Sequence, residues 1–286
     1  MRTILLCLVP ALLAAGELKT DIEFVKRADV VLKLDAYIPD GPGPFPAVIW
    51  VHGGGFVTGD KQPAPKSLLD PLVQAGFAWF SVNYRLAPAY TFPAHTDDVE
   101  SAVEYIKKHA KQFKINPKRL VLTGASAGGH LVSFVGAHHR KGNGVAAVIP
   151  FFGEHDLVDR VHTKGPCMID GKVVPDPGPM CLSPGLAKFL GITAASPNAD
   201  AVVRKASPAT YVRKNMPPYL LIHGDKDFNV PIEQSERMLE IMKKAGARCE
   251  LIRVEGGGHG FAAWDKDPAM AGYRQQMLDW LKRVLR

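Results

Sequence analysis

The sequence predicts an α/β protein with a mostly parallel sheet and helices on both faces. Short apolar runs, each about as long as a buried strand, alternate with longer stretches that carry apolar residues at helical spacing. Three of these runs end in glycine-rich loops, at residues 52–56, 124–129 and 256–260. The chain has 286 residues, 47% of them hydrophobic, which is enough for one large domain with a substantial core.

The first residues differ in composition from the rest of the chain. Residues 1–16 carry a single charge, Arg2, and an apolar run followed by small residues before Glu17. This pattern is typical of a secretory signal peptide and is too short to cross a membrane. We therefore expect residues 17–286 to form the mature domain, secreted or periplasmic and without stable membrane insertion. The alternative is an N-terminal helix or anchor.

Strands and helices are expected to alternate through the rest of the chain. An antiparallel hairpin over residues 22–25 and 30–38 leads into the parallel part of the sheet. The further predicted strands span residues 47–51, 78–82, 120–122, 145–152, 219–224 and 250–254. The predicted helices span residues 65–75, 97–113, 127–138 and 269–284.

Residues 153–218 interrupt this alternation. The segment is rich in proline and shows little periodicity outside residues 186–190. It falls between two strands, so it is expected to form a lid-like insertion over the carboxyl edge of the sheet, or else an inert surface excursion. Cys167 and Cys181 lie within it and are able to form a disulfide in an exported protein, while Cys249 leaves an odd count of cysteines in residues 17–286.

Ser126 lies at the centre of a G-x-S-x-G pattern between an apolar run and a predicted helix. Small residues at Gly124 and Gly128 permit a tight strand-to-helix turn that lifts the central serine out of the chain. The hydroxyl would then stand beside the first backbone N–H groups of a helix, where negative charge is favoured. This arrangement is typical of a nucleophilic serine, although a small residue in a tight turn is the alternative.

Two other segments supply the groups that such a serine needs. Upstream, a strand ends in His52, three glycines and Phe56, whose backbone N–H groups are able to approach a substrate oxygen closely. Downstream, Asp227 and His259 each follow a predicted strand. The chain order serine, acid, histidine is that of a nucleophile–acid–base triad built at the carboxyl edge of an α/β sheet.

These motifs resemble the α/β-hydrolase fold esterases and lipases that carry an H-G-G-G oxyanion loop, the feruloyl-esterase-like and hormone-sensitive-lipase-like group. The resemblance runs from Phe45 to Phe261. Its motifs lie at residues 52–56, 59–61, 83–88, 92–94, 124–129, 223–231 and 259–261. Ala125 stands where hormone-sensitive-lipase relatives usually have Asp, which favours the feruloyl-esterase-like side.

The resemblance implies a role for each candidate residue. Ser126 is the expected nucleophile, His259 the general base and Asp227 the acid that orients it. The backbone N–H groups of Gly54, Gly55 and Ala127 are the expected oxyanion hole, and Phe56 the expected substrate-binding residue; either substrate contact or a core position suits this aromatic ring. Asp225 is the alternative acid or a loop cap, and Glu154 and Asp156 are weaker alternatives for the acid.

The expected function is hydrolysis of short or aryl acyl esters through an acyl-enzyme, on a small-molecule or polysaccharide-linked substrate. No cofactor and no metal are expected, since no cluster of ligands has metal-site spacing. The net charge of +7 is diffuse, which argues against nucleic-acid binding. The alternatives are a serine peptidase or amidase, although peptidases of this fold usually carry a large propeller domain, and a non-catalytic binding protein of the same fold.

Overall fold

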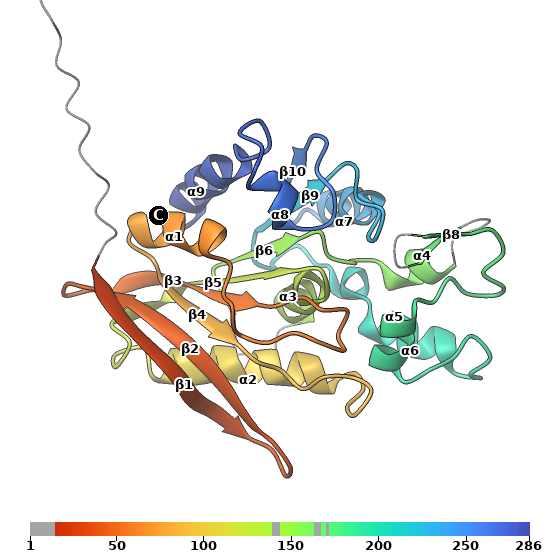
Figure 1. Cartoon of the computed structure of the whole chain (residues 1–286), viewed down its shortest axis with the longest axis horizontal. Helices are drawn as coiled ribbons and strands as arrows, with labels where there is room; N and C mark the ends of the chain where they lie inside the picture. Colours follow the sequence, from red (N-terminus) through yellow and green to blue (C-terminus); the bar gives the residue numbers. More distant parts are fainter. Residues whose placement is uncertain (1–14, 139–143, 163–166, 170–171) are drawn as a thin grey trace, which may run out of the picture.

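The computed structural model describes residues 15–138, 144–162, 167–169 and 172–286. Within these residues, eight strands form one sheet in the order β1-β2-β4-β3-β5-β6-β9-β10 (Figure 1). The strands are β1 (Gly16–Lys26), β2 (Val31–Pro39), β3 (Phe45–Val51), β4 (Ala78–Val82), β5 (Ile115–Ala125), β6 (Ala147–Phe151), β9 (Tyr219–Gly224) and β10 (Cys249–Val254).

The sheet is parallel from β4 to β10 and antiparallel only where β1 and β2 join it. Strands β4, β6 and β9 are buried along their whole length, because helices cover both faces of the parallel part. A parallel sheet places the carboxyl ends of its strands along one edge. The prediction of a mostly parallel sheet is confirmed.

Helices cover the sheet on both faces. The helices of the described residues are α1 (Lys66–Gln74), α2 (Ala94–Lys108), α3 (Ala127–His138), α4 (Leu157–Val161), α5 (Pro184–Leu190), α6 (Ala199–Ala206), the 3-10 helix η1 (Pro208–Tyr211), α7 (Glu233–Lys244), α8 (Phe261–Trp264) and α9 (Tyr273–Val284). One core cluster contains buried residues of α2, α3 and α7, and the other those of α1 and α9. Figure 1 shows α1 and α9 on one side and α2 on the opposite side.

Several element boundaries differ from the prediction. Helix α2 begins at Ala94 and ends at Lys108, not over 97–113. Strand β5 is longer than the predicted 120–122 because it starts at Ile115, which pairs with Phe45 of β3. Pro117 and the charged residues after it interrupt the apolar pattern there, so the sequence concealed this pairing. Helix α9 starts at Tyr273, four residues after the predicted start.

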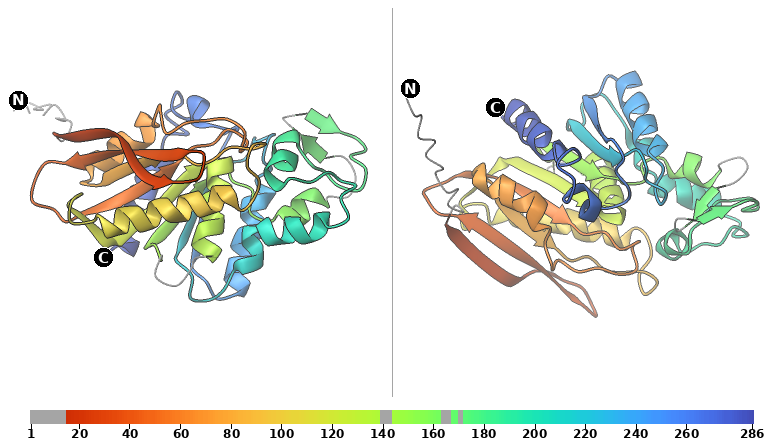
Figure 2. Two further views of the ribbon diagram at one scale, coloured as in Figure 1. Left: turned by 90° about the horizontal axis from the view of Figure 1, so that it is seen from below. Right: turned by 45° about the horizontal axis from the view of Figure 1, so that its top comes forward.

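The 153–218 segment has regular structure that its prolines concealed. It contains α4, α5, α6, η1 and a separate hairpin of β7 (Cys167–Ile169) and β8 (Lys172–Val174). Figure 2 shows α4, α5, α6 and this hairpin, coloured green to teal, grouped at one end of the molecule, whereas η1 packs against α3. Of the proposed signal peptide, residues 1–14 lie outside the described part of the chain, and Gly16 opens β1. Among the described helices, none has both the length and the apolar character needed to span a bilayer.

Buried histidines on the α2 and α3 side couple stability to pH. Burial lowers the pKa of His95 and of His130 to about 4, whereas in the unfolded chain each has its ordinary value near 6.5. As pH falls below about 6.5, the unfolded chain takes up protons that the folded one does not. This contribution to stability is therefore complete above that pH and is lost between about pH 6.5 and 4.

We expect the free energy of unfolding to fall by about 2 kcal/mol for each of these histidines between pH 8 and pH 5. Urea unfolding at the two pH values measures the difference. Equal stability at pH 5 and pH 8 would contradict the prediction.

Candidate active site

Ser126 occupies a strained turn between β5 and α3. Its φ of 55° lies in the left-handed region, where a non-glycine residue is uncommon. The flanking glycines allow the close approach of neighbouring strands: a Cβ at Gly128 would lie 2.1 Å from the carbonyl oxygen of Val51, and one at Gly124 would lie 2.6 Å from that of Gly128. The Ser126 N–H donates to the Phe151 carbonyl at 3.0 Å. The turn thus holds Ser126 at the position immediately before α3.

The structure brings Ser126, His259 and Asp227 into one hydrogen-bonded series. His259, in the loop after β10, has its Nε2 2.9 Å from Ser126 Oγ and its Nδ1 2.7 Å from Asp227 Oδ2. A carboxylate only accepts hydrogen bonds, so Nδ1 carries the proton. Nε2 is then the basic nitrogen and accepts the hydrogen bond from the serine hydroxyl. This geometry allows His259 to remove the hydroxyl proton.

The carboxylate of Asp227 is held from both sides. Its Oδ1 accepts the N–H groups of Asn229 and Val230, each at 2.9 Å. Burial raises the pKa of Asp227, but hydrogen bonds from His223 and His259 outweigh this effect and hold the pKa well below its usual value. The carboxylate is therefore charged whenever His259 is required as a base.

His223 is a buried neighbour of the acid whose contact the sequence did not predict. Its Nε2 lies 2.9 Å from the Val230 carbonyl and 3.3 Å from Asp227 Oδ2, so this nitrogen must be the donor. Its Nδ1 is then an acceptor for the hydroxyl of Ser235, at 2.8 Å. The Val230 carbonyl and the Asp227 carboxylate thus fix the tautomer of His223, and Ser235 gives the remaining ring nitrogen a hydrogen bond.

The variant Ser235→Ala is expected to lower kcat about tenfold, with KM little changed. Without the hydroxyl, the buried Nδ1 of His223 loses its hydrogen bond, so the ring is held less firmly beside Asp227 Oδ2, at a cost of about 1.4 kcal/mol in the transition state. Ester hydrolysis by the variant measures this. Ser133→Ala is the control, because it removes a similar buried serine–histidine contact, at 3.0 Å to His155. Equal losses in the two variants would show that Ser235 has no particular role.

The glycine loop after β3 has positive φ values, which glycine adopts without strain. Gly54 and Gly55 have φ values of 111° and 58°, and the Gly54 carbonyl accepts the N–H groups of Val57 and Thr58. Tyr84 supports the loop from behind through a hydrogen bond from its hydroxyl to the His52 carbonyl, at 3.1 Å. Within the described residues, the N–H groups of Gly54, Gly55 and Ala127 donate no hydrogen bond. These donors are therefore available to a substrate oxygen.

The variant Gly54→Ala is expected to lower kcat by about 10²–10³, the usual cost of losing one oxyanion donor. A Cβ at Gly54 would lie 2.1 Å from the Thr58 carbonyl oxygen, so the loop must move and its donors with it. Steady-state ester hydrolysis measures the loss. Gly76→Ala is the matched control, because Gly76 also has a positive φ, of 84°, but a Cβ there meets nothing within 4 Å. A variant that retains full kcat would contradict this prediction.

A cavity of about 650 Å³ opens beside Ser126 and His259. One part of its lining is aromatic, with Trp50, Phe152 and Phe261, and the Phe152 ring lies 4.8 Å from that of His259. The 153–218 segment supplies further lining residues, which are Glu154, Arg160, Ser183, Gly185 and Leu186. The cavity wall is therefore formed both by residues at the carboxyl edge of the sheet and by residues of the 153–218 segment.

Phe56 belongs to the cavity lining, but its side chain is 5% exposed. Its ring stacks on Phe189 of α5 with ring centroids 4.0 Å apart. Gly185, in the same helix, approaches the oxyanion loop so closely that a Cβ there would lie 2.8 Å from the Gly55 carbonyl oxygen. The insertion thus packs directly on the loop, and Phe56 lies mostly within this contact.

The other candidate acids have structural partners. Asp225 accepts the Gly256 N–H at 2.7 Å and so anchors the loop that carries His259. Asp156 caps α4 and pairs with Arg237, and Glu154 pairs with Arg160. Since none of these carboxylates contacts His259 in the part of the chain that the structure describes, Asp227 is the acid that the geometry favours.

The remaining candidate groups are the cysteines and the possible metal ligands. Cys181 is disulfide-bonded, while the side chain of Cys167, the partner that the sequence offered for it, lies outside the described residues. Cys249 is free, and burial raises its pKa to about 12, so it is not a reactive thiol at neutral pH. The part of the chain that the structure describes contains no group of three or more His, Cys, Asp or Glu placed to hold a metal ion.

This chain is similar in sequence and in structure to known proteins. The model of the BD-FAE family matches residues 34–242. Esterase LipC of Mycobacterium tuberculosis is 28% identical over 237 residues, which is 78% of this chain and 54% of LipC. The acetylxylan esterase of Xylanibacter ruminicola is 27% identical over 257 residues, 87% of this chain and 47% of that protein. The chain therefore spans about half the length of these curated relatives.

A solved structure agrees over nearly the whole chain. A truncated carbohydrate esterase from gut microbiota superposes with a TM-score of 0.76 at 26% identity, covering 96% of this chain and 98% of the other.

Proposed function

The chain belongs to the BD-FAE family of α/β-hydrolase esterases, and from this premise we propose that it is a serine carboxylic-ester hydrolase working through an acyl-enzyme. The observation that carries the proposal is the continuous hydrogen-bonded series from Ser126 through His259 to Asp227, at the wall of a cavity. A serine and a base in contact, with the base oriented by a third group, is the arrangement that activates a hydroxyl as a nucleophile.

In the proposed first step, Ser126 Oγ attacks the ester carbonyl carbon while His259 Nε2 takes the hydroxyl proton. The carbonyl oxygen becomes an oxyanion that the N–H groups of Gly54, Gly55 and Ala127 stabilise. The bond from carbon to the alcohol oxygen then breaks, and the alcohol leaves with the proton from His259. Asp227 stabilises the imidazolium in between. Water repeats the sequence on the acyl-serine and releases the acid.

We propose short or aryl acyl groups as the acyl part, with acetyl or feruloyl esters of plant polysaccharide as the natural class. The names of similar proteins, an acetylxylan esterase and a carbohydrate esterase, support this direction. A cavity of about 650 Å³ is of the size of small-molecule sites. The 153–218 segment, which supplies part of the lining, is the proposed lid-like insertion that shapes the site.

A substrate series tests the proposal. The full chain is incubated with p-nitrophenyl esters of increasing acyl length, with methyl ferulate, with acetylated xylan and with an acyl-peptide amide. The proposal expects a burst of p-nitrophenol and kcat/KM values that are highest for short acyl esters or methyl ferulate. Faster cleavage of the amide than of any ester would indicate a peptidase instead. No turnover of any ester would overturn the proposal.

We also propose that residues 1–16 are removed on export and that the mature protein is secreted or periplasmic. The support is the single charge and the apolar run in this segment. Expression in the source cells followed by fractionation, with the intact mass measured in each fraction, tests the proposal. A protein that begins at Glu17 outside the cytoplasm is the expected result, and a full-length protein confined to the cytoplasm would contradict it.

A further inference from the structure

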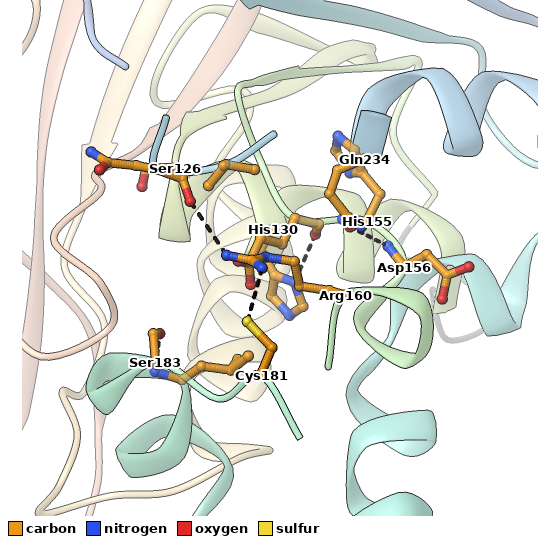
Figure 3. A network of polar contacts seen from close by, with 12 residues as sticks. Ser126, His130, His155, Asp156, Arg160, Cys181, Ser183 and Gln234 are labelled. Atoms are coloured by element: carbon orange, nitrogen blue, oxygen red, sulfur yellow. Dashed lines mark hydrogen bonds and ion pairs between the residues drawn. The ribbon is translucent and has the colours of Figure 1, made fainter. Parts of the chain in front are cut away.

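A buried ion pair forms part of the cavity wall. Arg160, on α4, places its Nε 3.2 Å from Glu154 Oε1, and the two side chains are 7% and 14% exposed. Both residues line the cavity that contains Ser126. Figure 3 shows the guanidinium end of Arg160 directed toward the side on which Ser126 lies. Charged groups with so little exposure are uncommon in a protein interior unless they are paired or used.

The pair is held rigidly. The Nη1 of Arg160 lies 3.4 Å from the sulfur of Cys181, which is itself disulfide-bonded, and Nη2 lies 3.5 Å from the Asn229 carbonyl. On the other side, His130 Nδ1 contacts the Glu154 carbonyl at 2.9 Å. These contacts fix the Arg160 guanidinium and the backbone of Glu154 before a substrate arrives, so a substrate group that binds to the pair costs little side-chain entropy.

The position of the pair matches the alcohol portion of an ester rather than its oxyanion. The proposed base, His259, must deliver its proton to the alcohol oxygen, so the alcohol lies on the side of the cavity near the loop of Asp227. Arg160 contacts this loop at Asn229, whose N–H is bonded to the Asp227 carboxylate. The proposed oxyanion donors lie on a different loop, at Gly54 and Gly55.

The chemistry of the pair selects among alcohols. A guanidinium only donates hydrogen bonds and a carboxylate only accepts them. A hydroxyl group both donates and accepts, so it is able to bind between the two. An anionic group would meet the carboxylate of Glu154, and an apolar group would remove water from both charges without replacing its hydrogen bonds.

We propose that Arg160 and Glu154 are specificity-determining residues that recognise a hydroxyl group on the alcohol portion of the ester, next to the scissile bond. The inference rests on the proposed function, because it concerns the alcohol released by that reaction. It predicts a preference for esters of polyols and sugars over esters of plain alcohols with the same acyl group.

Two esters that differ by one hydroxyl test the proposal: 2-hydroxycyclohexyl acetate and cyclohexyl acetate. The measured quantity is the ratio of their kcat/KM values. The unaltered protein should favour the hydroxylated ester. The double variant Glu154→Gln with Arg160→Gln, which removes both charges and leaves none unpaired, should lower the ratio about 10- to 100-fold, the usual effect of losing a hydrogen bond to a charged group. Arg160→Lys, which keeps the charge but not the fork of donors, should give an intermediate ratio.

A purely structural role predicts a different result, because it would lower both kcat/KM values together and leave the ratio unchanged. Arg237→Gln is the matched control, since Arg237 pairs with Asp156 in the same part of the fold but does not line the cavity. It should leave the ratio unchanged. Near-UV circular dichroism shows whether each variant is folded, and if the double variant is not, the Arg160→Lys ratio decides.

The two proposals fail in distinguishable ways. If the unaltered protein hydrolyses neither acetate nor any p-nitrophenyl ester, the esterase proposal is wrong. If it hydrolyses both acetates and the ratio does not respond to the substitutions at Glu154 and Arg160, the esterase proposal stands and the specificity proposal is overturned.

Discussion

The Ser126→Ala variant should lose about 10⁵–10⁶ in kcat for p-nitrophenyl acetate, because the reaction then has no nucleophile to form the acyl-enzyme. The residual rate should exceed that of hydrolysis in water by about 10³–10⁴, since the oxyanion donors and the binding cavity remain. Single-turnover kinetics should show no burst of p-nitrophenol.

The proposed control for this experiment is Ser133→Ala. Ser133 lies two turns further along α3, is buried and contacts His155 rather than His259. Its loss should leave the burst intact. A Ser126→Ala variant that retains more than about a hundredth of the original rate would remove Ser126 from the proposed mechanism.

The Asp227→Asn variant should lower kcat by about 10⁴ with little change in KM. The amide of asparagine is able to donate to His259 Nδ1 at the 2.7 Å contact now made with the carboxylate. The imidazole would then carry its proton on Nε2, facing the serine hydroxyl, and could not accept a second one. The change alters no group that the mechanism places against the substrate, so the loss should fall on kcat.

Asp225→Asn separates the two carboxylates of this loop. An asparagine there keeps an oxygen that accepts the Gly256 N–H, so the expected loss in kcat is severalfold at most. If Asp225→Asn proves more damaging than Asp227→Asn, the acid has been assigned to the wrong residue.

The alternation of strands and helices and the meeting of Ser126, Asp227 and His259 could be predicted from local patterns. Each of these residues follows a strand of the parallel part of the sheet, and parallel strands end at a common edge. Glycines at 124 and 128 were required by the turn itself, which is why the pattern is visible in the sequence. Local chemistry and fold agree at these positions.

Other parts of the site depend on contacts between distant segments. Arg160 and Glu154 reach the cavity only because α4 folds back beside the Asp227 loop, and no short motif encodes that path. The contact of His223 with Asp227 depends on how the loop at Val230 folds back on this ring, and its other nitrogen contacts Ser235, on α7. Helix α7 itself was absent from the prediction, although its apolar residues Met238 and Met242 are buried. These features come from tertiary packing rather than from propensity.

The contact between Gly185 and Gly55 has a practical consequence for altering the substrate range of this protein. Residues 183–190 are an attractive stretch to randomise, since Ser183, Gly185 and Leu186 face the cavity. Any side chain at position 185 would press on the carbonyl of Gly55, with 2.8 Å between the first added carbon and that oxygen. A library that includes this position would mix changes in selectivity with damage to turnover, so it should be kept invariant while its neighbours are varied.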